Sequence, residues 1–266
     1  MLYFGSFDPI HNGHTALAEW VVEHALCDMA VLVVSPQNPH KRDLRQTPEL
    51  DRFSMAELAC AASRFPDRIK PSAVEFLLPR PSYTIDTLRY LSEEFGGNME
   101  FSILMGGDLV GKFDTWKEAE TLRRDYPIYV YPRRGYDVSQ LGDGMTYLSD
   151  APMCDFSSTE VRRTIETGGD ASRMVAPAVL GYIREKKLWS PELYFDSLSE
   201  RIAAEPENPE ILLERGRWYY RRNEWGKALN DFNRAAEIAP DCTEARQMRE
   251  MIYEILQFRY TDIYNP

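Results

Sequence analysis

Apolar residues in the first 190 positions fall alternately into short runs of strand length and longer stretches with helical spacing. Strands that alternate with helices are typical of a parallel sheet covered by helices on both faces. We therefore expect an α/β, doubly wound, Rossmann-like domain over residues 1–190, with ligands bound beyond the carboxyl ends of its strands. The apolar runs that predict strands are residues 2–4, 30–34, 69–71, 101–105, 128–131 and 145–148. The helix patterns begin near His14, Thr47, Thr84, Trp116, Ser158 and Pro177.

The strand pattern stops after "GYIREKKLWSPELYF", and the rest of the chain has helical spacing throughout. We expect a small all-α, tetratricopeptide-like domain over 191–266, with a half-repeat at about 191–206 and a last helix over about 243–257. The alternative is an antiparallel helical appendage whose amphipathic packing imitates the repeat. The residues at repeat spacing are Leu212, Gly216, Tyr219, Ala228, Phe232, Ala235 and Pro240.

A single helical repeat cannot bury both of its faces, because such arrays gain stability by stacking on their neighbours. We expect the tail to pack on the α/β domain, on a second copy in a homo-oligomer, or on a protein partner.

Composition excludes several classes of protein. A hydrophobic content of 44% in 266 residues supports a real core, whereas the longest apolar runs are only strand-sized. The beginning of the chain lacks a basic segment followed by an apolar signal core, so we expect a soluble, cytoplasmic protein without a membrane partner. The four cysteines form no C-x-x-C pair, which argues against a zinc site and a disulfide framework.

Net charge narrows the choice of ligand. A formal charge of -11 and a pI near 5.0 argue against a nucleic-acid partner. A small anionic substrate stays compatible with this charge, because local basic groups and helix ends can bind it.

The stretch "GSFDPIHNGHTALAEW", residues 5–20, places His11 and His14 in a turn between the first strand and the first helix. Gly5 and Gly13 permit close backbone approaches, and Pro9 stiffens the turn. The N-terminus of a helix offers unpaired N–H groups and a partial positive charge, which suit a phosphate. Taken alone, the stretch also fits a solvated corner of the fold.

A second motif, "DFSSTEVRRTIETG", spans residues 155–168. Ser157, Ser158 and Thr159 can cap a helix, and Arg162 lies one turn further along the same face. Hydroxyls, helix N–H groups and a guanidinium could thus surround one anion. A capped surface helix with a solvated arginine is the plain alternative.

Together, "GSFDPIHNGH" and "SSTEVR" resemble the H-x-G-H and S-x-T-x-x-R signatures of a nucleotidyltransferase superfamily with a Rossmann-like fold. "SPQNPHK", "RPSYTIDTL", "ILMGGDLVGKFDTWKEAETL" and "YPRRGY" resemble, in order and spacing, the bacterial nicotinate mononucleotide adenylyltransferases up to about residue 189. This resemblance implies an NAD-biosynthesis enzyme that transfers AMP from ATP to nicotinate mononucleotide, giving deamido-NAD and pyrophosphate. Mg²⁺ is then expected to arrive on the ATP phosphates rather than in a protein-built metal site.

The resemblance also implies residue roles. His11, His14 and Arg162 are the expected catalytic residues, because they would stabilise charge on the phosphates in a reaction that needs no general base. The expected ATP-binding residues are Gly5, Ser6, Phe7, His11, His14, Arg134, Ser158, Thr159 and Arg162.

For the acceptor, the resemblance implies that Trp116 stacks on the pyridine ring and that backbone N–H groups of Tyr83 and Thr84 bind the nicotinate carboxylate. Asp108 is expected near ribose hydroxyls, and Asn38, His40 and Lys41 near the entrance. The residues alone leave other interpretations open: a core aromatic for Trp116, an ordinary helix cap at Tyr83–Thr84, and a solvated loop for "PHKR".

Two features depart from the family pattern. The family has a second glycine where this chain has Phe4, and the bare family pattern lacks the helical tail. One alternative function is adenylyl transfer to another acceptor, such as nicotinamide mononucleotide or phosphopantetheine. Another is a nucleotide-sensing adaptor that acts through the tail.

Overall fold

The computed structural model describes residues 1–36, 46–136 and 141–263. The chain divides into two compact units, Met1–Thr164 with Asp170–Leu188 and Ile165–Gly169 with Trp189–Pro266. Within the described residues, a bilayer-spanning helix is ruled out by length and hydropathy.

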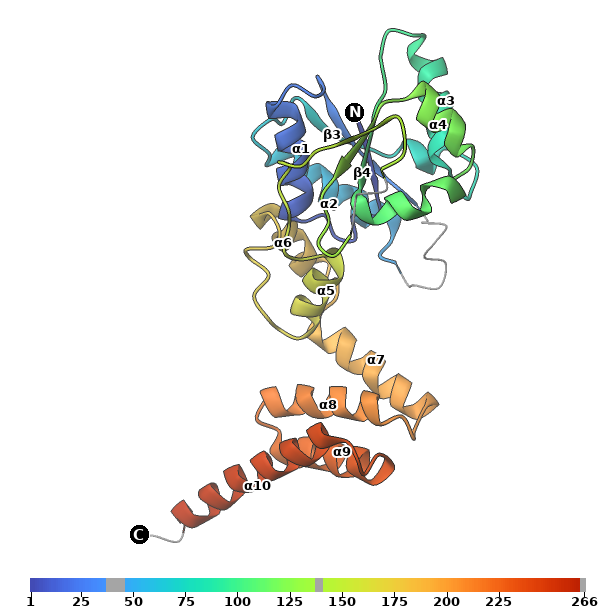
Figure 1. Cartoon of the computed structure of the whole chain (residues 1–266). Helices are drawn as coiled ribbons and strands as arrows, with labels where there is room; N and C mark the ends of the chain where they lie inside the picture. Colours follow the sequence, from blue (N-terminus) through green and yellow to red (C-terminus); the bar gives the residue numbers. More distant parts are fainter. Residues whose placement is uncertain (37–45, 137–140, 264–266) are drawn as a thin grey trace. The chain divides into compact units, whose positions relative to one another are not determined.

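The first unit is built on a six-stranded, fully parallel sheet with the order β3-β2-β1-β4-β5-β6 (Figure 1). The order runs outward in both directions from β1, which pairs with β2 on one side and β4 on the other. Ligand sites of such sheets lie beyond the strand ends at this reversal point. The predicted α/β doubly wound fold is therefore confirmed. The strands are β1 (Leu2–Gly5), β2 (Ala30–Val34), β3 (Ile69–Ser72), β4 (Ile103–Gly106), β5 (Ile128–Tyr131) and β6 (Met145–Tyr147).

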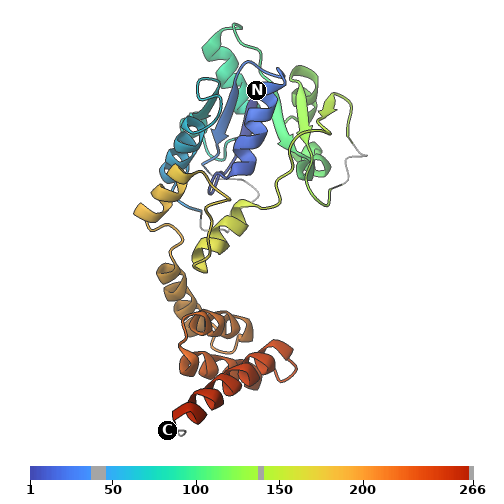
Figure 2. The same cartoon turned by 90° about the vertical axis from the view of Figure 1, so that its left-hand side faces the viewer.

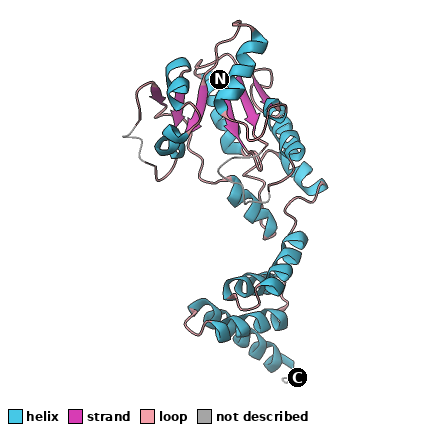
Figure 3. Cartoon of the chain, turned by 90° about the vertical axis from the view of Figure 1, so that its right-hand side faces the viewer, coloured by secondary structure: helices cyan, strands magenta, loops and turns pink. Residues whose placement is uncertain are grey.

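Helices cover both faces of the sheet (Figure 3). The helices of this unit are α1 (Asn12–Glu23), α2 (Glu49–Ala61), α3 (Thr84–Phe95), α4 (Ala119–Asp125), α5 (Ser158–Glu166) and α6 (Pro177–Glu185), with short 3₁₀ segments η1 (Val74–Phe76) and η2 (Gly107–Thr115). The helix expected at Trp116 is wrong in its start: Trp116 follows η2 in an extended conformation, and α4 begins only at Ala119.

The strands alternate between the two faces, as the two-residue period of a strand requires. Every second residue of the central strands packs with α3, η2 and α4 in one core, while α1 and α2 contact β2 and β3. Buried members of this core are Leu2, Val33, Ile85, Leu88, Ile103, Met105, Phe113, Leu122, Ile128 and Val130.

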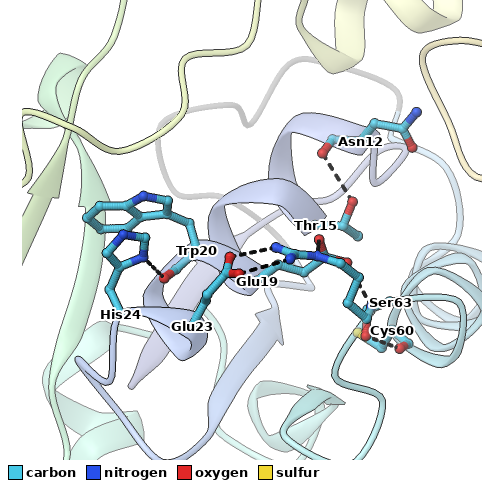
Figure 4. A network of polar contacts seen from close by, with 9 residues as sticks. Asn12, Thr15, Glu19, Trp20, Glu23, His24, Cys60 and Ser63 are labelled. Atoms are coloured by element: carbon cyan, nitrogen blue, oxygen red, sulfur yellow. Dashed lines mark hydrogen bonds and ion pairs between the residues drawn. The ribbon is translucent and has the colours of Figure 1, made fainter.

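An exposed ion-pair network joins α1 to the end of α2 (Figure 4). Arg64 binds Glu19 through Nε at 2.8 Å and Glu23 through Nη2 at 2.9 Å. On the same helix the His24 ring stacks on Trp20, with centroids 4.1 Å apart. Because the side chains of Arg64 and Glu23 are largely solvent-exposed, their ion pair fixes local geometry more than it adds stability.

The second unit consists of α7 (Pro191–Ala204), α8 (Pro209–Arg221), α9 (Trp225–Ile238) and α10 (Thr243–Ile263). Successive helices α8, α9 and α10 lie against one another (Figure 2). Gly216 allows the closest approach, since a Cβ there would lie 2.7 Å from Cε1 of Phe232. Leu212, Ala228 and Ala235 are buried in the same small core. These contacts suit the spacing noted in the sequence; identity as a tetratricopeptide repeat stays a prediction.

Ser190 and Asn208 explain where two of these helices begin. The Ser190 hydroxyl accepts from the N–H of Leu193, and the Asn208 side chain accepts from the N–H of Glu210. In both cases proline follows the capping residue at the first helical position, where its missing N–H costs no hydrogen bond.

Candidate functional site

The turn from β1 to α1 brings the first motif to the carboxyl edge of the sheet, at the reversal point between β1 and β4. Phe7 is buried in this turn with a positive φ of 45°, and Gly13 touches the loop that precedes α5. A Cβ at Gly13 would lie 2.4 Å from Cβ of Cys154, so only glycine fits. The two motifs of the sequence are therefore packed directly against each other.

His11 and His14 form a reciprocal cap at the start of α1. Nδ1 of His11 accepts from the N–H of Gly13 at 3.2 Å, and Nδ1 of His14 accepts from the N–H of His11 at 3.1 Å. The two rings stack with centroids 3.7 Å apart. Since a backbone N–H can only donate, each Nδ1 is an acceptor, and the neutral ring carries its proton on Nε2. Both imidazoles thus keep an N–H donor for a ligand.

Electrostatics keep these rings neutral when no ligand is bound. Burial, assisted by the positive charge of Arg133, lowers the pKa of His11 from 6.5 to about 4. Burial first, and then His11 and Arg133, hold the pKa of His14 well below 6.5. An arriving polyanion would meet N–H donors that need no proton transfer before they bind.

The second motif begins α5 and is bound to the first. Ser157 caps α5 in exchange with Glu160, whose Oε2 accepts from the N–H and hydroxyl of Ser157. The Ser158 hydroxyl donates to the carbonyl of Pro9 at 2.9 Å. Nη1 of Arg162 donates to the carbonyl of Asp8 at 2.6 Å, and Nη2 to the hydroxyl of Thr159 at 3.2 Å. Ser158 and Arg162 therefore fasten α5 to the histidine turn, and Arg162, with five N–H groups, uses two of them in these hydrogen bonds to described residues.

A cavity of about 300 Å³ lies between the two motifs. It shares lining residues with a second cavity of about 490 Å³ beside the histidines and with a third of about 190 Å³ beside Trp116. The central cavity brings together the predicted residues Gly5, Ser6, Phe7, His11, His14, Asp108, Trp116, Ser158, Thr159 and Arg162.

Asp108 and Arg133 lie on the side of the central cavity formed by β4 and β5. Oδ1 of Asp108 is 3.4 Å from Nε of Arg133, whose guanidinium lies 5.6 Å from the centre of the Tyr131 ring. The sequence singled out the neighbouring Arg134, which lines the histidine-side cavity but is 81% exposed and paired with the equally exposed Asp155. Arg133 borders both cavities and is the deeper of the two cations.

The third cavity is lined by the predicted acceptor residues Tyr83, Thr84 and Trp116. Thr84 is the first residue of α3, so the start of that helix lies at the cavity. Trp116 comes from the segment after η2 and packs on Phe113, with ring centroids 5.2 Å apart. Asn38, His40 and Lys41 lie outside the described residues.

A comparison with known sequences bears on what this site is. The model of the family described as cytidylyltransferase-like matches residues 2–164. The chain belongs to this family. The match lies within the first unit, which carries all three cavities.

Curated relatives of the chain agree with one another. The chain is 37% identical over 185 residues to a probable nicotinate-nucleotide adenylyltransferase of Flavobacterium johnsoniae, covering 68% of this chain and 94% of that protein. It is 39% identical over 180 residues to a protein of Bacteroides fragilis with the same name, covering 67% and 87%.

Among solved structures, the chain resembles the nicotinic acid mononucleotide adenylyltransferase of Plasmodium falciparum complexed with NaAD, with a TM-score of 0.59. That likeness covers 71% of this chain and 95% of the other at 19% identity, so it bears on the fold alone.

Besides Asp8 in the histidine turn, Arg52 and Glu75 are buried charged residues near this site that were not singled out from the sequence. Arg52 of α2 is fully buried and, among the described residues, donates to carbonyl oxygens at Ser6, Ser35, Pro36 and Thr47. It thereby ties the ends of β1 and β2 together. Its position four residues before Ala56, on the apolar face of α2, is the signal that could have identified it.

Glu75 in η1 is the other, and it lines the acceptor-side cavity. No pattern in the sequence marked it. For Arg133, strand alternation was an available signal, because Arg133 has the same parity as Tyr129 and Tyr131, opposite to the core-facing Ile128 and Val130.

Proposed function

We propose that the chain is a nicotinate-nucleotide adenylyltransferase, which transfers the AMP part of ATP to nicotinate mononucleotide and releases deamido-NAD and pyrophosphate. The observation that carries this proposal is the pair of neutral histidines, each with Nδ1 fixed by a backbone N–H, in a cavity that also contains Arg162. The relatives in Flavobacterium johnsoniae and Bacteroides fragilis bear the name of the same activity.

The reaction needs alignment and charge stabilisation rather than a base. An oxygen of the acceptor's phosphate is already ionised at neutral pH and attacks the α-phosphorus of ATP. The new P–O bond forms as the bond from the α-phosphorus to the bridging oxygen breaks, and the electron pair leaves with pyrophosphate. Groups that donate to the phosphoryl oxygens during this step lower the barrier.

In this proposal His11 and His14 donate through Nε2–H to the triphosphate, and Arg162 binds the β and γ phosphates with the N–H groups that Asp8 and Thr159 leave free. Backbone groups of Gly5, Ser6 and Phe7, and the first turn of α5 at Ser158 and Thr159, complete the phosphate site. Mg²⁺ enters as part of the ATP substrate, held mainly by phosphate oxygens.

The third cavity suits the acceptor's ring. Trp116 offers an aromatic face for stacking. The N–H groups at the start of α3, around Tyr83 and Thr84, can bind the acidic group of the pyridine through charge-assisted hydrogen bonds. Asp108 can accept from ribose hydroxyls, and we add Arg133 to the proposed nucleotide contacts because it borders both histidine-lined cavities.

An acceptor panel tests the assignment. Pyrophosphate release from Mg²⁺·ATP is measured with nicotinate mononucleotide, nicotinamide mononucleotide and phosphopantetheine. The expected result is the highest kcat/KM for the nicotinate compound. Preference for another acceptor would replace this function, and ATP binding without turnover on any acceptor would favour the sensing adaptor.

A further inference from the structure

Glu75 is a carboxyl group buried at the acceptor-side cavity, with only 3% of the residue exposed. A buried carboxyl is costly unless its oxygens receive hydrogen bonds. Burial raises the pKa of Glu75, while hydroxyl donors oppose that rise. An acidic side chain is unexpected in a cavity that is proposed to bind an acidic ligand. The position of Glu75 therefore needs a specific explanation.

The hydrogen-bond partners of Glu75 provide it. Ser82 donates to Oε2 at 3.1 Å and Thr87 donates to Oε1 at 3.0 Å. These two hydroxyls stand immediately before and after the segment that opens α3. Thr87 also reaches the carbonyl of Tyr83 at 3.4 Å. One carboxyl group therefore holds both ends of the first turn of α3.

This hold matters because α3 lacks a side-chain cap of its own. The residue at the capping position is Tyr83, whose side chain makes no capping hydrogen bond. In the first turn, the N–H of Asp86 donates to the carbonyl of Tyr83 at 2.9 Å, and the N–H groups of Thr84 and Ile85 precede this first hydrogen bond of the helix. Their direction is set by the backbone of residues 82–87, and Glu75 is the group that braces that backbone from within.

Glu75 is also linked to the frame of the phosphate site. The Ser35 side chain interacts with the carboxyl group and lowers its pKa, and the Ser35 carbonyl accepts from Arg52 at 2.7 Å. Arg52 in turn binds the carbonyl of Ser6 at 2.6 Å. Polar contacts through Ser35 and Arg52 thus link Glu75 at the acceptor-side cavity to Ser6 in the histidine turn.

We propose that Glu75 is a positioning residue for the acceptor: by holding Ser82 and Thr87 it aims the N–H groups at the start of α3 toward the acidic group of the pyridine ring. The inference rests on the proposed function in taking this cavity as the acceptor's. The carboxyl oxygens of Glu75 accept hydrogen bonds from the hydroxyls of Ser82 and Thr87. Glu75 therefore does not compete with the ligand for the N–H groups at the start of α3.

The test compares kinetic constants of the full-length chain with Glu75→Ala and Glu75→Gln. Glu75→Ala is expected to raise the KM for nicotinate mononucleotide about tenfold or more, with kcat and the KM for ATP within about twofold. Glu75→Gln can still pair with both hydroxyls and is expected to recover most of the loss. A purely structural role would instead change kcat and both KM values together.

Glu49→Gln is the matched control. It removes the exposed Arg80–Glu49 ion pair, at 2.7 Å, from the same stretch of chain without touching Glu75, and all constants are expected to stay within about twofold of wild type. If Glu75→Ala does not fold, Ser82→Ala is measured instead, with a smaller rise in the same KM expected. An equal rise in the KM for ATP and for nicotinate mononucleotide in Glu75→Ala would overturn the inference. A Glu75→Gln variant that recovers none of the loss would overturn it as well.

The two proposals fail in different ways. Wild-type protein without turnover of nicotinate mononucleotide would refute the proposed function and, with it, the choice of ligand for this cavity. Wild-type protein with that turnover, but unchanged acceptor KM in Glu75→Ala, would refute the inference alone.

Discussion

Two clusters of buried polar side chains, one in each unit of the chain, use their hydrogen bonds differently. In the helical unit, buried Asp231 of α9 pairs with Arg215 of α8 through two hydrogen bonds of 2.7 and 2.8 Å, so the hydrogen-bonding capacity of both side chains is directed at each other. In the sheet-based unit, His11 and His14 use one ring nitrogen for the backbone and keep the other. The histidine pair thus keeps a donor for a ligand, whereas the Arg215–Asp231 pair stabilises the contact between two helices.

The largest expected effect comes from His14. In His14→Ala we expect kcat for pyrophosphate release to fall by about 10²–10³-fold, the usual cost of one lost donor to developing charge. The free energy of unfolding is expected to change far less than the activation free energy. His24→Ala, at the exposed end of the same helix, is the control and should keep wild-type turnover. Full activity in His14→Ala would contradict the proposed function.

The second prediction is that the stability of the two units depends differently on pH. The pKa of His11 is about 4 in the folded state and 6.5 ordinarily, so the unfolded chain binds more protons between these values. Stability from this group is complete above about pH 6.5 and is lost as the pH falls toward about 4, by roughly 3 kcal/mol at most.

Calorimetry of the full chain at several pH values between 4 and 7.5 checks this. His11→Asn, which keeps a capping side chain but cannot be protonated, should reduce the acid dependence of the sheet-based unit and leave the contribution of His14. The four histidines of the sequence all precede residue 41, so the helical unit should show no histidine contribution. An unchanged slope in His11→Asn would contradict the buried, neutral state of that ring.

The smallest expected effect concerns the helical unit. Asp231→Asn weakens a buried, charge-assisted pair and should lower the free energy of unfolding of that unit by about 1–3 kcal/mol. Glu244→Gln weakens the exposed Arg217–Glu244 pair and should cost less than about 1 kcal/mol. Turnover should be unchanged in both. Urea unfolding measures the loss of unfolding free energy in each variant. Equal losses in the two variants would contradict the expected difference between a buried and an exposed ion pair.

Local pattern was enough to predict the sheet and most helix starts. Thr84, Ser158 and Pro177 begin helices as expected, because capping chemistry and apolar spacing are properties of neighbouring residues. The start near Trp116 failed because the "FDTW" stretch closes a 3₁₀ segment rather than opening a helix, and Glu118 adopts a left-handed conformation before α4. Hydrophobic period alone does not distinguish these cases.

The candidate site was predictable only in part. Its motif residues lie together around one cavity. Within the structure, however, Ser158 and Arg162 donate hydrogen bonds to the carbonyls of Pro9 and Asp8. Arg52 and Glu75 escaped prediction because their partners are contributed by other elements, and a charged residue in an amphipathic segment is ordinarily solvated. Whether such a charged residue is buried depends on contacts with segments that are distant in the sequence.

The bond from Arg162 to the carbonyl of Asp8 joins residues 154 positions apart, and it sets a condition on folding. Contacts between distant parts of a chain form late, because a long loop must close before they contribute. During synthesis the histidine turn leaves the ribosome early but has no α5 to fasten it until nearly the whole sheet-based unit has followed. Partly made chains therefore lack the contact that joins the two motifs around the central cavity.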